Sequence, residues 1–248
     1  MRQNELGHCG GAREQGPAGG LLIGVSGAVA SGKSTVAEIL AELVGGTLVS
    51  ADAIAHEVLA GDAGVQRAIA ERWGNACLDG SGGIARAKLA EIVFNSPDDL
   101  AELNRIIHPA ILRRIREQID AAHRTAARET AAHGPARETA AHKGGSPWII
   151  VDAALLFETG LDAICDARIF VQSDWSVRAE RARRDRGWSE DELRRRDAAQ
   201  MPADRKVALS DYTASNNGSR YETKRQIEVI VQHIERHRRK FNGQREST

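Results

Sequence analysis

The chain has 248 residues, enough to bury the core of one α/β domain. Its 34 Lys and Arg residues balance 34 Asp and Glu residues, so net charge gives no argument for a nucleic-acid or membrane partner. Aromatic residues make up 4% and the three cysteines form no CxxC pair, which argues against single-strand stacking platforms, a zinc site and a disulfide framework.

Residues 1–20 are rich in glycine and polar residues and are predicted to be a disordered leader. They contain no apolar core of the kind that a signal peptide needs. No run in the chain approaches the ~18 apolar residues of a membrane span. We therefore expect a cytoplasmic protein.

Strands and helices are predicted to alternate along the rest of the chain. Residues 21–26 are a short apolar run typical of a buried strand, and residues 33–44 have apolar side chains at helical spacing. Residues 62–124 are mainly helical in pattern. Further strands are predicted at residues 47–50, 148–151, 167–172 and 212–214, and a final helix from 220 to about 237. This alternation predicts an α/β fold with a parallel sheet and right-handed crossovers.

A short repeat interrupts this pattern. ARETAAH occurs at residues 127–133 and again at 136–142. Two copies are too few for a repeat array, and the histidines lie nine residues apart without a pattern of partner carboxylates. We interpret residues 121–147 as an exposed, partly helical insertion rather than a metal-binding tract.

Residues 27–35, GAVASGKST, match the G-x-x-x-x-G-K-[ST] pattern of a phosphate-binding loop. The motif follows a predicted strand and opens a predicted helix, which is the context that the pattern requires. A flexible glycine turn with a surface lysine is the alternative, and this context disfavours it. We therefore predict a nucleoside triphosphate site.

The chemistry of the motif explains its residue types. Glycines let backbone N–H groups close around phosphate oxygens, and the helix N-terminus adds a favourable dipole. Lys33 would place its charge on the β- and γ-phosphates, and Ser34 would offer its hydroxyl to Mg²⁺. The predicted ATP-binding residues of the loop are Gly27, Ala28, Val29, Ala30, Ser31, Gly32, Lys33, Ser34 and Thr35.

The phosphate acceptor is indicated by further segments. They are LVSADAIAHEVL (48–59), ARAKLAEIVF (85–94), NRIIHPAI (104–111), IIVDAALLFETGLD (149–162), RARRDRGWS (181–189), RDAAQMPADRK (196–206) and SDYTASNNGS (210–219). In this order and spacing, the chain resembles dephospho-CoA kinases over roughly residues 21–235, apart from the insertion. The resemblance implies transfer of the γ-phosphate of ATP, with Mg²⁺, to the ribose 3′-hydroxyl of dephospho-CoA, the last step of coenzyme A synthesis.

The same resemblance implies a P-loop NTPase core with a parallel sheet flanked by helices, a helical substrate subdomain and a helical lid. The expected division is a single kinase domain at 21–240 and a tail at 241–248; within the domain, the substrate subdomain is expected at 62–125, the insertion at 121–147 and the lid at 175–206. The expected partners are ATP and dephospho-CoA, without nucleic acid or membrane, in a monomer or small homo-oligomer. The alternatives are a kinase for a nucleoside or nucleotide, and a nucleotide-driven switch or motor; dependence of turnover on a small acceptor separates the enzymes from the switch.

Asp52 follows a predicted strand, where open α/β sheets place their ligands. A carboxylate there could accept or orient the proton of the acceptor hydroxyl. Its alternative role is the N-cap of a helix over residues 53–59. The family pattern is Asp-Ala-Asp, in which Asp52 matches the second, functional aspartate and Ser50 replaces the first.

Asp152 closes another predicted strand and is the candidate carboxylate for the metal's water shell, with loop capping as the alternative. The family's Pro-Leu-Leu-Phe-Glu is residues 154–158 here, with Ala154 in place of the proline. Leu155 and Phe157 are the candidate acceptor-binding residues of this segment. Phe157 could equally belong to the core.

Arg86 and His108 match family positions on the acceptor side. A histidine followed by proline is also typical of a helix boundary, so a structural role for His108 stays open. Asn216 lies in an Asn-Asn-Gly turn before the final helix. The resemblance places Asn216 near the adenine of ATP, although turn chemistry alone explains it as well.

Residues 178–205 are rich in arginine. Such a run is ordinarily interpreted as a solvent-exposed helical face with salt bridges. Phosphoryl transfer instead needs positive charge around the moving group and exclusion of water. The resemblance assigns Arg184 to the phosphates of ATP, and Arg181 and Gln200 to the acceptor. Residues 189–192 predict a capping box that begins the second lid helix. The predicted catalytic residues are Asp52, Lys33 and Arg184.

Overall fold

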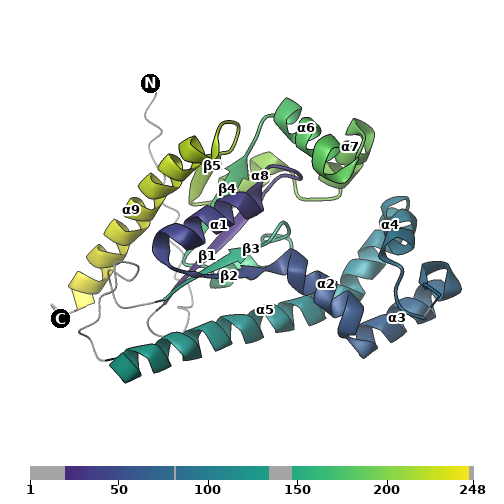
Figure 1. The fold of residues 1–248 in the computed structure, drawn as a ribbon, viewed down its shortest axis with the longest axis horizontal. Helices are drawn as coiled ribbons and strands as arrows, with labels where there is room; N and C mark the ends of the chain where they lie inside the picture. Colours follow the sequence, from purple (N-terminus) through teal and green to yellow (C-terminus); the bar gives the residue numbers. More distant parts are fainter. Residues whose placement is uncertain (1–19, 81, 134–146, 246–248) are drawn as a thin grey trace.

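The computed structural model describes residues 20–80, 82–133 and 147–245. Within these residues, five parallel strands form one sheet in the order β2-β3-β1-β4-β5 (Figure 1). The strands are β1 (Leu21–Gly27), β2 (Thr47–Ser50), β3 (Trp148–Asp152), β4 (Ala167–Gln172) and β5 (Tyr212–Ser215). The predicted strands and the α/β fold are confirmed. The predicted leader (residues 1–19 of it) and the second copy of the repeat lie outside the described residues.

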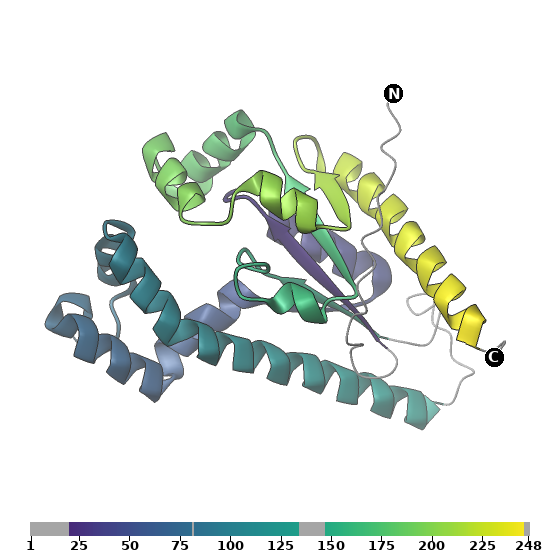
Figure 2. The same cartoon turned by 180° about the vertical axis from the view of Figure 1, so that it is seen from behind.

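Helices cover both faces of the sheet because successive strand residues point to opposite sides. In β1, Leu21, Ile23 and Val25 belong to the core under α1 (Lys33–Val44) and α9 (Arg220–Arg245), which lie on the face shown in Figure 1. Leu22 belongs to the core on the other face. Figure 2 shows that face, with α8 (Ala203–Leu209) in front of the sheet and α5 (Pro97–His133) running alongside it.

The segment between β2 and β3 extends the fold beyond one end of the sheet (Figure 1). It consists of α2 (Ala51–Gly61), α3 (Ala63–Trp73), a 3₁₀ turn η1 (Gly74–Cys77), α4 (Arg86–Phe94) and α5. Because α2 leaves directly from the carboxyl end of β2, this helical region begins at the edge where parallel sheets bind ligands.

The helix α5 corrects one expectation. A helix boundary at His108–Pro109 is wrong, since α5 continues through Pro109 to His133. Pro109 has no N–H to donate to the carbonyl four residues earlier, but Leu103 before it and Ala110 and Ile115 after it are buried in the core and hold the helix on both sides of this gap. The first copy of the repeat is therefore a continuation of α5 rather than a separate element.

The arginine-rich segment forms α6 (Trp175–Arg186) and α7 (Glu190–Ala198), which project beyond the sheet near the phosphate-binding loop (Figure 1). Ser189 caps α7 and accepts a hydrogen bond from the Glu192 N–H, as the sequence predicts. The Glu192 carboxylate instead pairs with Arg195 and Arg196, so it is not free to close the reciprocal half of the capping box. A 3₁₀ turn η2 (Leu161–Ile164) completes the elements between β3 and β4. Among all described helices, none is long and apolar enough to cross a membrane.

Candidate active site

The phosphate-binding loop joins β1 to α1 at the carboxyl edge of the sheet, as predicted. Gly32 caps α1 in a left-handed conformation with φ of 80°, and a Cβ atom there would collide with the side-chain amide of Asn216. Ala30 also has a left-handed φ of 61°, which is uncommon for a residue with a side chain. These two left-handed residues constrain the shape of the loop.

The centre of the site is the Lys33 amine. Its Nζ lies 3.1 Å from Asp52 Oδ2 and 3.0 Å from Asp152 Oδ1. The sheet brings these carboxylates together, because Ser50 at the end of β2 is in register with Asp152 at the end of β3. Burial alone would lower the pKa of the Lys33 amine, but the two carboxylates outweigh burial and raise that pKa above its ordinary value of 10.5.

Asp52 and Asp152 differ in exposure, which suits different tasks. The Asp52 side chain is 59% exposed and open to a substrate, whereas that of Asp152 is 3% exposed. The alternative of Asp52 as a helix N-cap is wrong. Ser50 is the N-cap of α2 and accepts a hydrogen bond from the Ala53 N–H, so the Asp52 carboxylate in the first turn is free of this role. Among the described residues, loop capping by Asp152 is not seen either; its carboxylate is buried against Lys33.

The donor set at this edge fits Mg²⁺. Ser34 is exposed and adjoins Lys33, and the Asp152 carboxylate, whose Oδ1 lies 3.0 Å from the Lys33 amine, supplies anionic oxygens beside it. Within the described part of the chain, no group of three or more His, Cys, Asp or Glu residues could hold a metal by itself. Mg²⁺ needs no such group, since it keeps several waters and takes only one or two protein ligands beside substrate phosphates.

Asn216 and Arg181 hold the phosphate-binding loop through hydrogen bonds to backbone carbonyls. Asn216 is 5% exposed; its amide N–H donates to the Ser31 carbonyl at 2.9 Å, and its amide oxygen accepts from Thr223. Arg181 donates to the carbonyls of Ser31 and Asn216 at 3.1 and 2.9 Å. Burial and the positive charge of Arg184 lower the pKa of the Arg181 guanidinium. The structure thus places Arg181, which the resemblance assigned to the acceptor, against the phosphate-binding loop.

Arg184 is not brought to the loop. Its side chain is 63% exposed and its Nε lies 2.7 Å from Asp185 Oδ1. The hydrogen bond and charge of Asp185 raise the pKa of Arg184.

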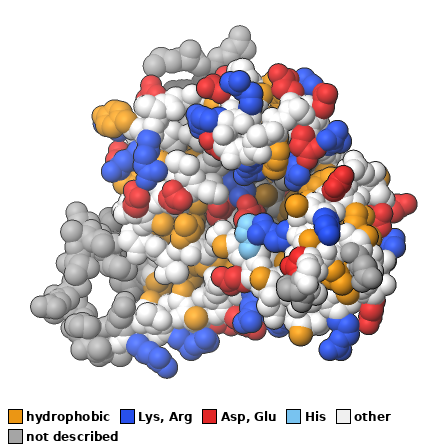
Figure 3. Space-filling model, turned by 45° about the vertical axis from the view of Figure 1, so that its right-hand side comes forward, with side chains coloured by type: hydrophobic (Ala, Val, Ile, Leu, Met, Phe, Trp, Pro, Cys, Tyr) orange, Lys and Arg blue, Asp and Glu red, His pale blue; other side chains and the backbone are white. Residues whose placement is uncertain are grey.

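Arg86 of α4, which the resemblance assigns to the acceptor, contacts His56 of α2, with Nη2 and Nε2 2.5 Å apart. His56 lies four residues after Asp52, which places both side chains on one face of α2. The four-residue spacing was the signal in the sequence that could have identified His56. Basic and acidic side chains, with a His, gather near the centre of the face seen in Figure 3.

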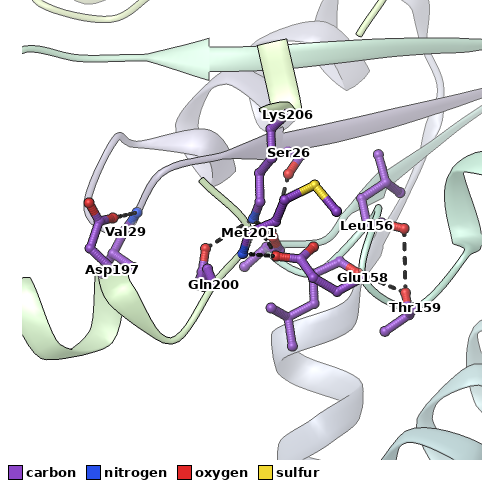
Figure 4. Close-up of polar contacts among 11 residues, drawn as sticks. Ser26, Val29, Leu156, Glu158, Thr159, Asp197, Gln200, Met201 and Lys206 are labelled. Atoms are coloured by element: carbon purple, nitrogen blue, oxygen red, sulfur yellow. Dashed lines mark hydrogen bonds and ion pairs between the residues drawn. The ribbon is translucent and has the colours of Figure 1, made fainter. Parts of the chain in front are cut away.

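Gln200 and the segment after β3 meet at a buried lysine (Figure 4). Lys206 is 1% exposed, and its Nζ lies 2.8 Å from Glu158 Oε1, 2.8 Å from the Ala154 carbonyl and 3.1 Å from Gln200 Oε1. The carbonyl of Ala154, which replaces the family's proline, thus receives a hydrogen bond that holds this turn. Lys206 was not identified from the sequence, because its spacing in α8 gives no sign of burial.

Leu155 and Phe157 differ in burial. Phe157 is 8% exposed and belongs to the hydrophobic core, which favours the core interpretation of this residue. Leu155 is only partly buried.

His108 is half-buried on α5, and burial lowers the pKa of its imidazole from 6.5, an effect that the Glu158 carboxylate partly opposes. Below about pH 6.5 the unfolded chain therefore binds a proton that the folded protein binds less readily, so the free energy of unfolding should fall as the pH falls. In His108→Gln this part of the acid destabilisation should disappear. Urea unfolding at pH 7 and pH 5.5 measures it, with His233→Gln as the control; equal pH dependence in wild type and His108→Gln would contradict the prediction.

Comparison with known proteins places this site in a family. The family model for dephospho-CoA kinase matches residues 21–131 and 134–222. A dephospho-CoA kinase of Geobacillus kaustophilus is 34% identical over 85% of this chain and 95% of its own length, and one of Chlorobaculum tepidum is 36% identical over 86% and 95%. In fold, the chain is similar to TT1252 from Thermus thermophilus (TM-score 0.65, 24% identity, covering 87% and 98% of the two chains) and to dephospho-CoA kinase from Campylobacter jejuni (TM-score 0.55, 23% identity, covering 87% and 97%).

Proposed function

The chain belongs to the dephospho-CoA kinase family, and we propose that it transfers the γ-phosphate of ATP to the ribose 3′-hydroxyl of dephospho-CoA at the site around Lys33. It is a kinase by this membership. The observation that carries the choice of site is the position of the Lys33 amine between the Asp52 and Asp152 carboxylates, directly after the phosphate-binding loop.

Asp52 is the proposed general base. Its exposed carboxylate would accept the proton of the 3′-hydroxyl as the hydroxyl oxygen bonds to the γ-phosphorus and the bond from that phosphorus to the bridging oxygen of ADP breaks. Lys33 would bind the β- and γ-phosphate oxygens and stabilise the charge that develops there. On this proposal Arg86, with its partner His56, lies on the acceptor side. His108, Leu155 and Gln200 stay proposed acceptor-side residues.

Arg184 and Asn216 stay the proposed ATP contacts outside the loop. Arg184 is carried by α6, and its exposed ion pair with Asp185 is one that a phosphate could replace. For Asn216 the bonds to Ser31 and Thr223 support an indirect role, in which it holds the loop rather than the adenine.

Mg²⁺ is the proposed metal, and Ser34 and Asp152 would hold it. It would supply positive charge that offsets the negative charge of the ATP phosphates during transfer. We also propose that the protein acts in the cytoplasm as a monomer or small homo-oligomer, without nucleic-acid or membrane partners.

Removal of the metal gives a direct prediction. EDTA should abolish turnover, and added Mg²⁺ should restore it. Asp152→Asn should raise the Mg²⁺ concentration for half-maximal activity by about tenfold, because an amide oxygen is a weaker ligand than a carboxylate. A Mg²⁺ titration of ADP release measures this, with Asp120→Asn on the exposed face of α5 as the control. An unchanged Mg²⁺ requirement in Asp152→Asn would remove Asp152 from the metal site.

The experiment that tests the function is ADP release by the purified protein with Mg²⁺ and ATP, given dephospho-CoA, a panel of nucleosides, or no acceptor. Release that requires dephospho-CoA, with coenzyme A formed in equal amount, is the expected result. ADP release with a nucleoside would support the proposed ATP site but would overturn dephospho-CoA as the acceptor. Turnover that ignores the acceptor would indicate a nucleotide-driven switch instead.

A further inference from the structure

Side chains of the lid hold both polar groups of one residue in the phosphate-binding loop. The Val29 N–H donates to Asp197 Oδ1 at 3.3 Å, and the Val29 carbonyl accepts from Arg178 Nε at 2.8 Å. Arg178 Nη2 also donates to the same Asp197 oxygen, at 2.5 Å. The three residues thus form a closed ring of three hydrogen bonds. Each bond has an ionised group, the Arg178 guanidinium or the Asp197 carboxylate, as donor or acceptor.

The two side chains come from different lid helices, Arg178 from α6 and Asp197 from the end of α7. Figure 4 shows Asp197 directed at the Val29 N–H. Arg178 is 7% exposed and its guanidinium carbon lies 5.3 Å from the Trp175 ring centroid, so its position is fixed. Not every lid arginine is placed in this way: Arg183, on the same helix as Arg178, is exposed.

The held residue adjoins the strained point of the loop. Ala30 follows Val29 and has the left-handed φ of 61°. A side chain makes that conformation unfavourable, so neighbouring contacts must maintain it. Hydrogen bonds to both the N–H and the C=O of Val29 fix the backbone immediately before Ala30, which limits the loop's freedom to relax when ATP is absent.

We propose that Arg178 and Asp197 are positioning residues that preset the phosphate-binding loop for ATP and connect its shape to the lid. The proposal rests on the proposed function in taking ATP as the ligand of the loop. A preset loop binds its ligand without the cost of ordering, so loss of either side chain weakens ATP binding. Because both side chains act through one ring of contacts, their effects depend on each other.

The test is calorimetric titration of the full chain with ATP and no acceptor. Asp197→Ala and Arg178→Ala should each raise the Kd for ATP by about tenfold, and the double variant should be no weaker than the single ones. Asp197→Asn should recover most of the affinity, since its amide oxygen still accepts from the Val29 N–H. Arg183→Ala, which removes an exposed arginine of α6, should bind ATP as the wild type does.

A further double variant is used in case the alanine variants do not fold. Arg178→Met with Asp197→Leu keeps apolar volume between lid and loop without buried charge, so it should remain folded by circular dichroism and still show the raised Kd. A Kd in these variants that is unchanged or lower, or additive losses in the double alanine variant, would overturn the proposal. Since ATP binding is measured without acceptor, failure here is separate from failure of the proposed acceptor, which only the acceptor panel detects.

Discussion

Asp52→Asn should lower kcat by about 100- to 10,000-fold and leave the Kd for ATP within about twofold of wild type. The amide occupies the same volume in the first turn of α2 but cannot accept the proton of the acceptor hydroxyl. The helix itself should be unaffected, because Ser50 rather than Asp52 is its N-cap. Loss of one exposed partner of Lys33 costs little stability, since the Asp52 side chain is 59% exposed.

Initial rates of ADP release with dephospho-CoA, together with ATP titration, test this prediction. Glu57→Gln is the matched control, because Glu57 is an exposed carboxylate on the same helix. A kcat within threefold of wild type in Asp52→Asn would exclude Asp52 as the general base. A raised Kd for ATP with unchanged kcat would assign Asp52 to binding instead.

The sequence predicted those parts of the site whose position depends on short motifs and on the strands and helices next to them. The glycine-rich motif of residues 27–35 needs only the strand before it and the helix after it, and both were evident from apolar spacing. Asp52 and Asp152 could be placed because each lies within two residues of the end of a predicted strand, and the carboxyl ends of parallel strands share an edge; the role of Asp52 rested mostly on the resemblance.

The parts that the sequence did not predict depend on contacts between distant segments. Arg178 and Arg184 are six residues apart on α6 in one arginine-rich run, yet the Arg178 side chain is 9% exposed and that of Arg184 is 63% exposed. Composition and helical spacing alone did not distinguish them, because the difference comes from the phosphate-binding loop, about 150 residues earlier in the chain. The burial of Lys206 also comes from a segment distant in the sequence, because its partners Ala154 and Glu158 follow β3.

Pro109 shows a local signal that tertiary packing overrides. The His-Pro pair favours a helix boundary, but the buried residues that follow it continue the apolar stripe of α5. The free energy of burying that stripe exceeds the cost of one missing backbone hydrogen bond.

Lys33→Met should lower kcat/KM for ATP by about 1000-fold, because the ammonium group that would bind the transferring phosphate is lost. The same change leaves Asp152, whose side chain is 3% exposed, without its cation. Removal of one partner from a buried ion pair costs about 3 kcal/mol, so the free energy of unfolding should fall as well. Activity and stability therefore have to be separated.

Lys33→Arg separates them. A guanidinium keeps the positive charge beside Asp152 and should restore most of the stability, but its planar, larger head does not reproduce the compact ammonium and should leave kcat/KM for ATP low. Urea unfolding and initial rates on both variants make the comparison, with Lys224→Met on the exposed face of α9 as the control. Activity that recovers in step with stability would mean that Lys33 acts only by neutralising the two carboxylates. A stable and inactive Lys33→Arg would instead show that the amine itself contacts the phosphate, which is the role that its position between Asp52 and Asp152 supports.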